Sequence, residues 1–203
     1  MGVYTRHVQP RLLEATLADR HTGPIRSRVC AGLSGDVLEI GFGSGLNLPH
    51  LPAAVRALSV VEPSRVALRR SEPRRAASPV PVAVVGDDAQ DLPLPDASVD
   101  AALSTWNLCG IADPRAALRE VRRVLRPGGT LHFVEHGLAP DGSVARWQRR
   151  GNRLNRLVAG CVLDRDVRAL LEDSGLAVLS VDTYYEPSAP RPAGFFYEGR
   201  ATA

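Results

Sequence analysis

The fold is decided by Asp36-Val37-Leu38-Glu39-Ile40-Gly41-Phe42-Gly43-Ser44-Gly45, where an apolar run breaks into three alternating glycines. The run at 36–40 has the length and apolar character of a buried strand, and the glycines form the turn that follows it. A turn built from glycines lets the backbone pass close to a ligand, because a Cβ there would collide with it. Taken alone, the pattern is a weak signal, because an ordinary strand-to-helix turn is the alternative.

Strands and helices alternate outward from this stretch. Apolar runs at 56–61, 81–85, 99–104 and 130–134 predict further strands, each ending in polar or glycine residues. Such alternation predicts an α/β fold with a mostly parallel sheet and helices on both faces. The last two extended runs, 176–185 and 194–200, have no helix between them, so we expect an antiparallel hairpin.

Helix boundaries follow from capping residues. A helix is expected over 8–20, and a second opens at Pro24 and stops near Gly32. The clearest helix follows Asp113 and ends before the proline and glycines of 126–129. Asp164 is expected to cap a later helix that ends at Gly175.

Composition fits a single globular domain. A chain of 203 residues with 44% apolar and 23% charged residues can bury a proper core. Its first twenty residues lack the apolar centre of a signal peptide, and no stretch is apolar enough to span a bilayer, so we expect a cytoplasmic protein. The cysteines, Cys30, Cys109 and Cys161, match no metal-ligand spacing, and no metal site is expected.

Ligands of such sheets lie beyond the carboxyl ends of the strands. Glu62, which ends the second strand, is placed to accept hydrogen bonds from ribose hydroxyls. Glu39 precedes Gly41 by two residues and could bind a cationic amino-acid group. A dinucleotide site is disfavoured, because it needs glycine or alanine where Leu46 stands and because a carboxylate repels pyrophosphate.

Three segments resemble the motifs of class I S-adenosylmethionine (SAM)-dependent methyltransferases. They are VLEIGFGSG at 37–45, GDDAQDLPLPDASVD at 86–100 with one extra aspartate, and LREVRRVLRPGG at 118–129. The resemblance implies a Rossmann-like, seven-stranded sheet whose last strand is antiparallel, within a single domain over 1–203. Residues 1–35 would then form a helical lid, 36–135 the SAM-binding core, and 136–203 the acceptor-side helices and C-terminal hairpin.

The resemblance also assigns the contacts of SAM and of its product S-adenosylhomocysteine. These residues are Glu39, Gly41, Gly43, Gly45, Asn47, Glu62, Pro63, Asp88, Ala89, Asn107 and Leu108. Asp88 would bind the adenine amino group, and the Ala89 backbone would bind a ring nitrogen. Because the aspartate is doubled, Asp87 could hold that role instead, although the register with Leu92 favours Asp88. Asn107 and Leu108 would line the methyl-transfer channel, unless they belong to an ordinary loop.

The second half of the chain bears on the acceptor. Glu135-His136-Gly137, Trp147-Gln148 and Gly160-Cys161 resemble the thiol methyltransferase-like group. His136 follows the fifth strand and is the candidate base or orienting group, with a purely structural histidine as the alternative. Tyr4, His7 and Trp147 are candidate substrate contacts, with core packing as the alternative. The group implies a small acceptor, namely a thiol, a phenol or quinol, or an amine.

Five arginines cluster at 146–156 beside a face that carries Trp147, Leu154 and Val158. They predict weak contact with a phospholipid surface or an anionic partner, or else a solvated face beside an apolar seam. No stable nucleic-acid partner is expected, because only 5% of residues are aromatic and the length leaves no room for an appended domain. RNA or protein methylation, and SAM binding without catalysis, are the alternative functions. The oligomeric state stays open.

Overall fold

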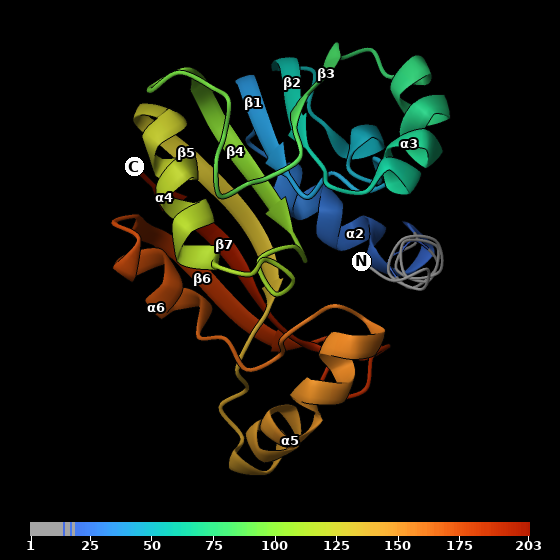
Figure 1. Ribbon diagram of the computed structural model, residues 1–203, viewed down its shortest axis with the longest axis vertical. Coiled ribbons are helices and arrows are strands. Elements are labelled where there is room, and N and C mark those ends of the chain that lie inside the picture. The colour runs from blue at the N-terminus through green and yellow to red at the C-terminus, as the bar shows by residue number, and fades with distance from the viewer. Residues whose placement is uncertain (1–13, 15–16, 18) are drawn as a thin grey trace.

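The computed structural model describes Glu14, Leu17 and residues 19–203 (Figure 1). Tyr4, His7 and most of the helix expected over 8–20 lie outside the described residues. The helix expected from Pro24 is α2 (Asp19–Cys30), which begins earlier and contains this proline. Pro24 therefore marks no helix start, and it removes only one main-chain hydrogen bond near the N-terminal end.

The sheet has seven strands in the order β3-β2-β1-β4-β5-β7-β6. Their bounds are β1 (Gly35–Ile40), β2 (Val55–Val61), β3 (Val82–Gly86), β4 (Val99–Thr105), β5 (Leu125–His136), β6 (Ala177–Tyr185) and β7 (Phe195–Thr202). Strands β1 to β5 pair in parallel, whereas β7 runs antiparallel to both β5 and β6. The predicted Rossmann-like sheet with a reversed last strand and a closing hairpin is confirmed.

β5 begins earlier than predicted. Its first residue is Leu125, whose backbone is already extended (φ −67°, ψ 134°), instead of Thr130. Leu125 pairs with Val99 of β4, and the regular register resumes at Thr130 after an irregularity. The two glycines between these positions thus form a bulge that joins the helix to the strand.

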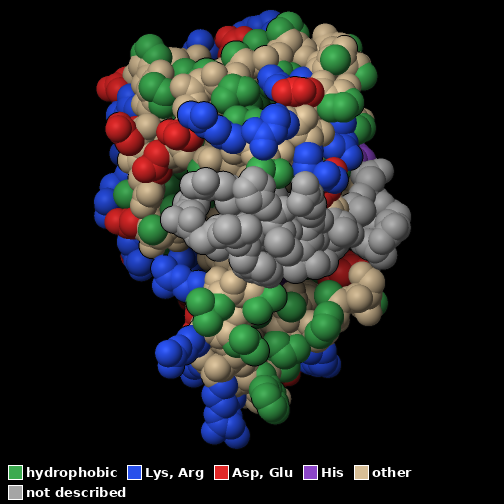
Figure 2. Space-filling view, turned by 45° about the vertical axis from the view of Figure 1, so that its right-hand side comes forward, with side chains coloured by type: hydrophobic (Ala, Val, Ile, Leu, Met, Phe, Trp, Pro, Cys, Tyr) green, Lys and Arg blue, Asp and Glu red, His purple; other side chains and the backbone are tan. Residues whose placement is uncertain are grey.

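The remaining helical elements are η2 (Leu48–His50), α3 (Arg65–Ala77), α4 (Pro114–Val124), α5 (Gly142–Val158) and α6 (Val167–Asp173). Ser64 caps α3 and Asp113 caps α4, each by accepting a hydrogen bond from the first turn. The prediction for α6 was wrong by two residues: Asp166, and not Asp164, accepts from an N–H of that helix. α5 lies at the lower end of the molecule in Figures 1 and 2.

Two apolar layers flank the sheet, one on each face. The layer beneath α4 and α6 includes Leu38, Leu118 and Leu171. The layer beneath α2 includes Val37 and Val29. Val37 and Leu38 are neighbours in β1, so their side chains point to opposite faces. Helices therefore cover both faces, as the alternating pattern predicted.

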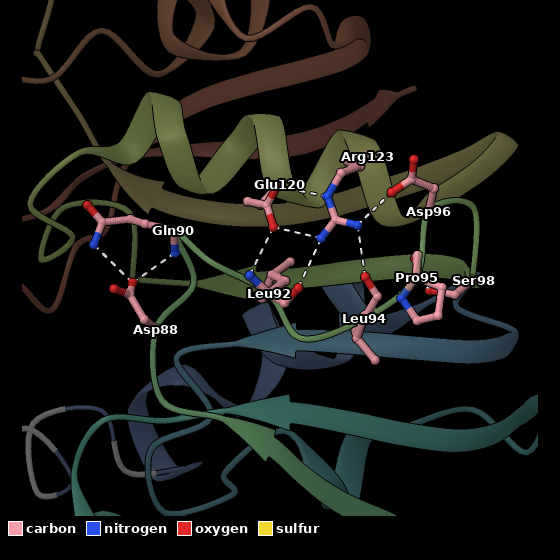
Figure 3. A network of polar contacts seen from close by, with 9 residues as sticks. All are labelled: Asp88, Gln90, Leu92, Leu94, Pro95, Asp96, Ser98, Glu120 and Arg123. Carbon is pink, nitrogen blue, oxygen red and sulfur yellow. Dashed lines mark hydrogen bonds and ion pairs between the residues drawn. The ribbon is translucent and has the colours of Figure 1, made fainter.

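The loop that follows β3 is tied to α4 by one ion-pair network (Figure 3). The guanidinium of Arg123 donates to the carbonyls of Leu92 and Leu94 at 3.0 and 2.8 Å, and to Asp96 at 2.7 Å. Glu120 accepts from Arg123 and from the Leu92 N–H at 2.9 Å. This network holds the loop that carries Asp87 and Asp88 at a fixed distance from the sheet. It also gives a physical role to the acidic and basic residues of the 118–129 motif.

Candidate functional site

The candidate site lies at the carboxyl ends of β1 and β4. The chain runs outward from β1 through β2 to β3, and then returns to place β4 on the other side of β1. A sheet that reverses its strand order in this way leaves a crevice between the loops at the reversal. The loops after β1, β2, β3, β4 and β5 all reach this edge (Figure 1).

Two glycines shape the first turn. Gly41 has φ +71°, and a Cβ there would lie 2.1 Å from the side chain of Asn107. Gly43 has φ +59°, and no heavy atom lies within 4 Å of the position of its missing Cβ. Gly41 thus permits contact with the loop after β4, while Gly43 opens onto space that a ligand could occupy. Gly45 also has positive φ and packs near Phe42.

A buried polar network surrounds Glu39, which is 1% exposed. The Asn47 amide donates to Glu39 at 2.8 Å and to Thr105 at 3.0 Å, and its oxygen accepts from Arg26 at 2.6 Å. Burial raises the pKa of Glu39 to about 8, against the opposing effects of Asn47 and Arg26. Among the described residues, Glu39 Oε2 has no hydrogen-bond partner. A buried carboxylate oxygen of this kind fits the ammonium group of an amino-acid ligand such as the methionyl part of SAM.

Glu62 lies at the end of β2 and is 8% exposed. Its two oxygens accept from the N–H groups of Gly43 and Ser64, both at 2.7 Å. Burial raises the pKa of Glu62, and these two hydrogen bonds oppose the shift. Each oxygen keeps a second lone pair, so the carboxylate can still accept from two ribose hydroxyls. The residues present therefore fit the ribose of SAM.

A cavity of about 260 Å³ opens beside Glu62. It is lined by Glu62, Pro63, Arg65, Leu68, Val84, Val85, Gly86 and Asp87. Asp88 is not among these lining residues: it is exposed, and its carboxylate accepts from the backbone and side chain of Gln90 at 2.8 and 2.9 Å (Figure 3). Ala89 is 8% exposed. The structure thus brings Pro63 and Asp87 together with Glu62, and it holds Asp88 in a turn next to them.

Glu135 fixes the loop after β4 by hydrogen bonds. It is buried, and sequence patterns did not predict it as a site residue. Glu135 accepts from the Ser104 hydroxyl at 2.6 Å and from the Asn107 N–H at 3.1 Å. Burial raises the pKa of Glu135 to about 7, against these hydrogen bonds. Asn107 is partly exposed beside Gly41, whereas Leu108 is 1% exposed and packs in the core beneath α4. The side chain of Asn107 thus reaches the site, and that of Leu108 is taken up by the core.

His136 ends β5 and faces two cysteines. Its Nδ1 lies 3.7 Å from the Cys109 sulfur, which in turn donates to the Cys161 sulfur at 3.2 Å. The edge-on ring of Phe196, 5.0 Å away between centroids, fixes the imidazole plane. His136 is partly exposed as a residue, but desolvation of its imidazole lowers the pKa to about 4. The ring is therefore neutral near pH 7.

α5 carries Trp147, the last candidate site residue, and it turns apolar side chains to the outside and polar ones to the inside. Trp147 is 68% exposed, and the exposed fractions of Leu154 and Leu157 are 67% and 66%. The buried Gln148 instead bonds to the Ala139 N–H and to the carbonyls at positions 137 and 192. The apolar seam therefore faces outward, and Figure 2 shows hydrophobic side chains beside arginines at this end of the molecule. In the described part of the chain, no helix has the length and apolar character to cross a membrane.

Three features of the site were missed by reasoning from sequence. Arg26 completes the Glu39 network from α2, Glu135 holds the loop after β4, and Cys161 lies against Cys109. A signal existed for Glu135 alone, since it follows an apolar run at the edge where the other site residues lie. The other two contacts join segments that are distant along the chain.

The chain is similar in sequence and in fold to known methyltransferases. The family model described as "Methyltransferase domain" matches residues 38–133. Thiol S-methyltransferase TMT1B of Homo sapiens is 33% identical over 179 residues, which cover 84% of this chain and 72% of the human protein. Demethylmenaquinone methyltransferase of Clavibacter sepedonicus is 32% identical over 59% of this chain and 49% of its own. A SAM-dependent methyltransferase structure from Thermotoga maritima, 21% identical, superposes with a TM-score of 0.68 over 97% of this chain and 98% of its own.

The state of Glu39 predicts that cofactor binding releases a proton. With a pKa of about 8, the unliganded carboxyl is protonated near pH 7, and an ammonium ligand favours its ionised form. Binding of S-adenosylhomocysteine at about pH 7 should therefore release close to one proton, and the affinity should rise as the pH approaches about 8. Calorimetry in buffers of different ionisation enthalpy measures the released protons.

Glu39→Gln should abolish this proton release and weaken binding, while its melting temperature near pH 7 stays at the wild-type value. The amide keeps the hydrogen bond from Asn47 and replaces a carboxyl that is already uncharged at that pH. Glu172→Gln, an exposed control on α6, should behave as wild type. Equal proton release from the Glu39→Gln variant would contradict the assigned role.

Substitutions of Asp87 and Asp88 should weaken cofactor binding to different extents. Asp88→Asn should weaken S-adenosylhomocysteine binding by about tenfold or more, because it removes a carboxylate that would accept from the adenine amino group. Asp87→Asn should change the affinity less. Calorimetric titration of both variants decides between the two positions, and the reverse order would assign the adenine contact to Asp87, which lines the cavity.

Proposed function

Because the chain belongs to the class I SAM-dependent methyltransferases, we propose that it methylates the sulfur of a small-molecule thiol. The similarity to thiol S-methyltransferase TMT1B carries this proposal, since it extends over 84% of the chain. The methyltransferase family model covers only 38–133. The longer similarity therefore includes residues outside the shared cofactor core, where acceptor pockets are built.

Residues of the first three loops would hold SAM. Glu39 would meet the ammonium group, the Gly41-to-Gly45 turn would pass beneath the methionyl part, and Glu62 would hold the ribose. Pro63 and the aspartates at 87 and 88 would enclose the adenine. SAM supplies a methyl group activated by its positive sulfonium.

The acceptor would lie between the loops after β4 and β5. Asn107, in the loop after β4, contacts Gly41 of the cofactor turn, and His136 lies at the end of the adjacent strand β5. The protein must align the acceptor sulfur with the methyl group and remove the thiol proton, and a thiol with a pKa near ~8.5 needs only modest help. His136 is neutral near pH 7, but burial lowers its pKa to about 4, which makes it a weak proton acceptor; we therefore assign it the role of orienting the sulfur.

The division of the chain follows from these roles. Residues 36–135 would form the SAM-binding core, and 136–203 the acceptor-side helices and the C-terminal hairpin. Within the proposed lid of residues 1–35, α2 packs on the sheet through the buried Ile25 and Val29, so shielding of the acceptor would fall to the segment before α2, which contains Tyr4 and His7. Lids of this kind exclude water from the reacting groups.

The proposal predicts which acceptors turn over. Purified protein and SAM are incubated with benzyl mercaptan, a quinol, a phenol and an amine, and the S-adenosylhomocysteine that forms is quantified. We expect turnover of the thiol in clear excess over the other classes. Turnover of the quinol alone would instead align the activity with the demethylmenaquinone methyltransferase relative, and protein that binds SAM but turns over none of them would refute small-molecule transfer to these classes.

His136→Ala should lower turnover of the accepted thiol by about 10²-fold, the loss usual when a group that positions a reactant is removed. Its S-adenosylhomocysteine affinity should stay near the wild-type value, because the cofactor contacts lie in other loops. Turnover equal to wild type, with unchanged affinity, would reduce His136 to a structural residue.

We propose further that the exposed face of α5 rests on an anionic membrane surface. The arginines at 146, 149, 150, 153 and 156 are all exposed, and no acidic residue lies between 142 and 163. They flank the exposed side chains of Trp147, Leu154 and Leu157. A helix with an apolar face bordered by arginines binds the interface of anionic bilayers.

The membrane proposal predicts co-sedimentation with phosphatidylserine-containing vesicles and not with pure phosphatidylcholine. The fluorescence of Trp147 should shift to the blue on binding, since the other tryptophan, Trp106, is 6% exposed and already in the core. Leu154→Glu with Leu157→Glu should abolish sedimentation. Leu179→Glu, which is a control at a 58% exposed position on β6, should leave it unchanged. Equal loss in the control, or no sedimentation of wild type, would contradict this assignment.

A further inference from the structure

Cys109, His136 and Cys161 bring three metal-ligating atoms to one point of the structure. The two sulfurs and a ring nitrogen all lie within 4.8 Å of one another. They come from the loop after β4, the end of β5 and the loop after α5, so only the folded chain assembles them. Spacing along the sequence does not measure distance in the fold, and these three residues meet although no short spacing joins them.

We propose that these three side chains bind a thiophilic divalent metal ion of the zinc type. Two thiolates and a neutral imidazole form a donor set that zinc prefers, and a site with three protein ligands keeps its fourth position open. The distances suit it: a tetrahedral zinc ion would need sulfur–sulfur and sulfur–nitrogen separations of about 3.8 and about 3.6 Å. The observed separations are 3.2 Å between the sulfurs and 3.7 Å from Cys109 Sγ to His136 Nδ1. Binding would widen the sulfur pair by about half an ångström.

The loop that carries Cys161 is held in place by hydrogen bonds from two other segments. Asn155 of α5 donates to the Cys161 carbonyl at 2.8 Å, and Asn152 accepts from the Leu163 N–H at 2.8 Å. The Val162 N–H donates to the Cys109 carbonyl at 2.9 Å, which joins the two cysteine loops directly. Such supporting bonds fix the orientation of the ligands before a metal arrives.

Charge balance favours a divalent ion at this partly buried position. Two thiolates neutralise its two positive charges, so the loaded centre carries no net charge and can be buried at low cost. The guanidinium of Arg165 donates to the carbonyls of Leu108 and Ile111 at 2.7 and 2.8 Å, and its positive charge on Cys109 is opposed by the negative charge of Glu135. The open position fits the sulfur of an acceptor thiol, whose proton would pass to solvent as the thiolate binds; this step rests on the proposed function.

Cobalt(II) tests the site without any need for activity. Reduced, metal-free protein is titrated with Co²⁺ and with Zn²⁺ in the presence of a phosphine reductant that is not itself a thiol. We expect one equivalent to bind, with the sulfur-to-cobalt charge-transfer absorption of thiolate ligation. Cys161→Ser should lower the affinity for Zn²⁺ by at least about 100-fold, since loss of supporting residues alone costs 10–100-fold. Cys30→Ala, which removes the remaining buried cysteine, should bind as wild type.

Two variants of His136 separate metal ligation from general-base chemistry. His136→Cys keeps a ligand and should retain Zn²⁺ binding, whereas His136→Phe should lose it. Addition of benzyl mercaptan should shift the visible bands of the cobalt protein, and benzyl alcohol should not. Absence of the charge-transfer band, or equal binding by Cys161→Ser and wild type, would overturn the metal site, and unshifted bands would overturn the open thiol position. Full thiol methylation by metal-free protein would leave the proposed function standing and overturn the role of the metal in it.

Discussion

The site depends on a close approach between the loops after β1 and β4. Gly41 has no side chain, which allows Asn107 to lie where a Cβ would come within 2.1 Å of it. Because β1 and β4 are adjacent and parallel, this contact places the cofactor turn directly beside the loop that carries Cys109. A larger residue at position 41 would separate the two halves of the site. Gly41 thus permits the contact between the two loops.

Two fully buried carboxylates hold these loops, and neither is explained by stability alone. Glu39 and Glu135 sit at the ends of β1 and β5, and burial raises their pKa values to about 8 and about 7. Burying a carboxyl group is costly unless donors compensate. Glu135 receives such donors from Ser104 and from the Asn107 backbone, so its role is to fix the loop after β4. In each of these carboxyl groups Oε2 has no hydrogen-bond partner among the described residues. Glu39 lies in the network beside the glycine turn, where we propose that this oxygen meets the ammonium group of SAM.

Local patterns predicted what depends on local physics. The strand-glycine turn, the cap at Asp113 and the antiparallel closing hairpin follow from periodicity and turn chemistry, and all are observed. The cap of α6 was wrong because Asp164 and Asp166 are chemically equal, and only the backbone path decides which one reaches the helix. The pairing of Cys109 with Cys161 bridges 52 residues, and no local pattern reports a contact of that range. The fold was therefore readable from sequence, whereas the acceptor side was not.

α5 shows why an apolar stripe need not face a core. The segments beneath it present backbone groups, at Ala139, Cys161 and Leu163, that need hydrogen-bond partners. Amide side chains supply these partners, so Gln148, Asn152 and Asn155 turn inward and the leucines and Trp147 are left on the opposite face. The same hydrogen bonds set Cys161 beside Cys109 and His136. The inward-facing amides therefore link the partly buried cysteine-histidine cluster to the apolar outer surface, since the hydrogen bonds that position Cys161 also leave the leucines and Trp147 exposed.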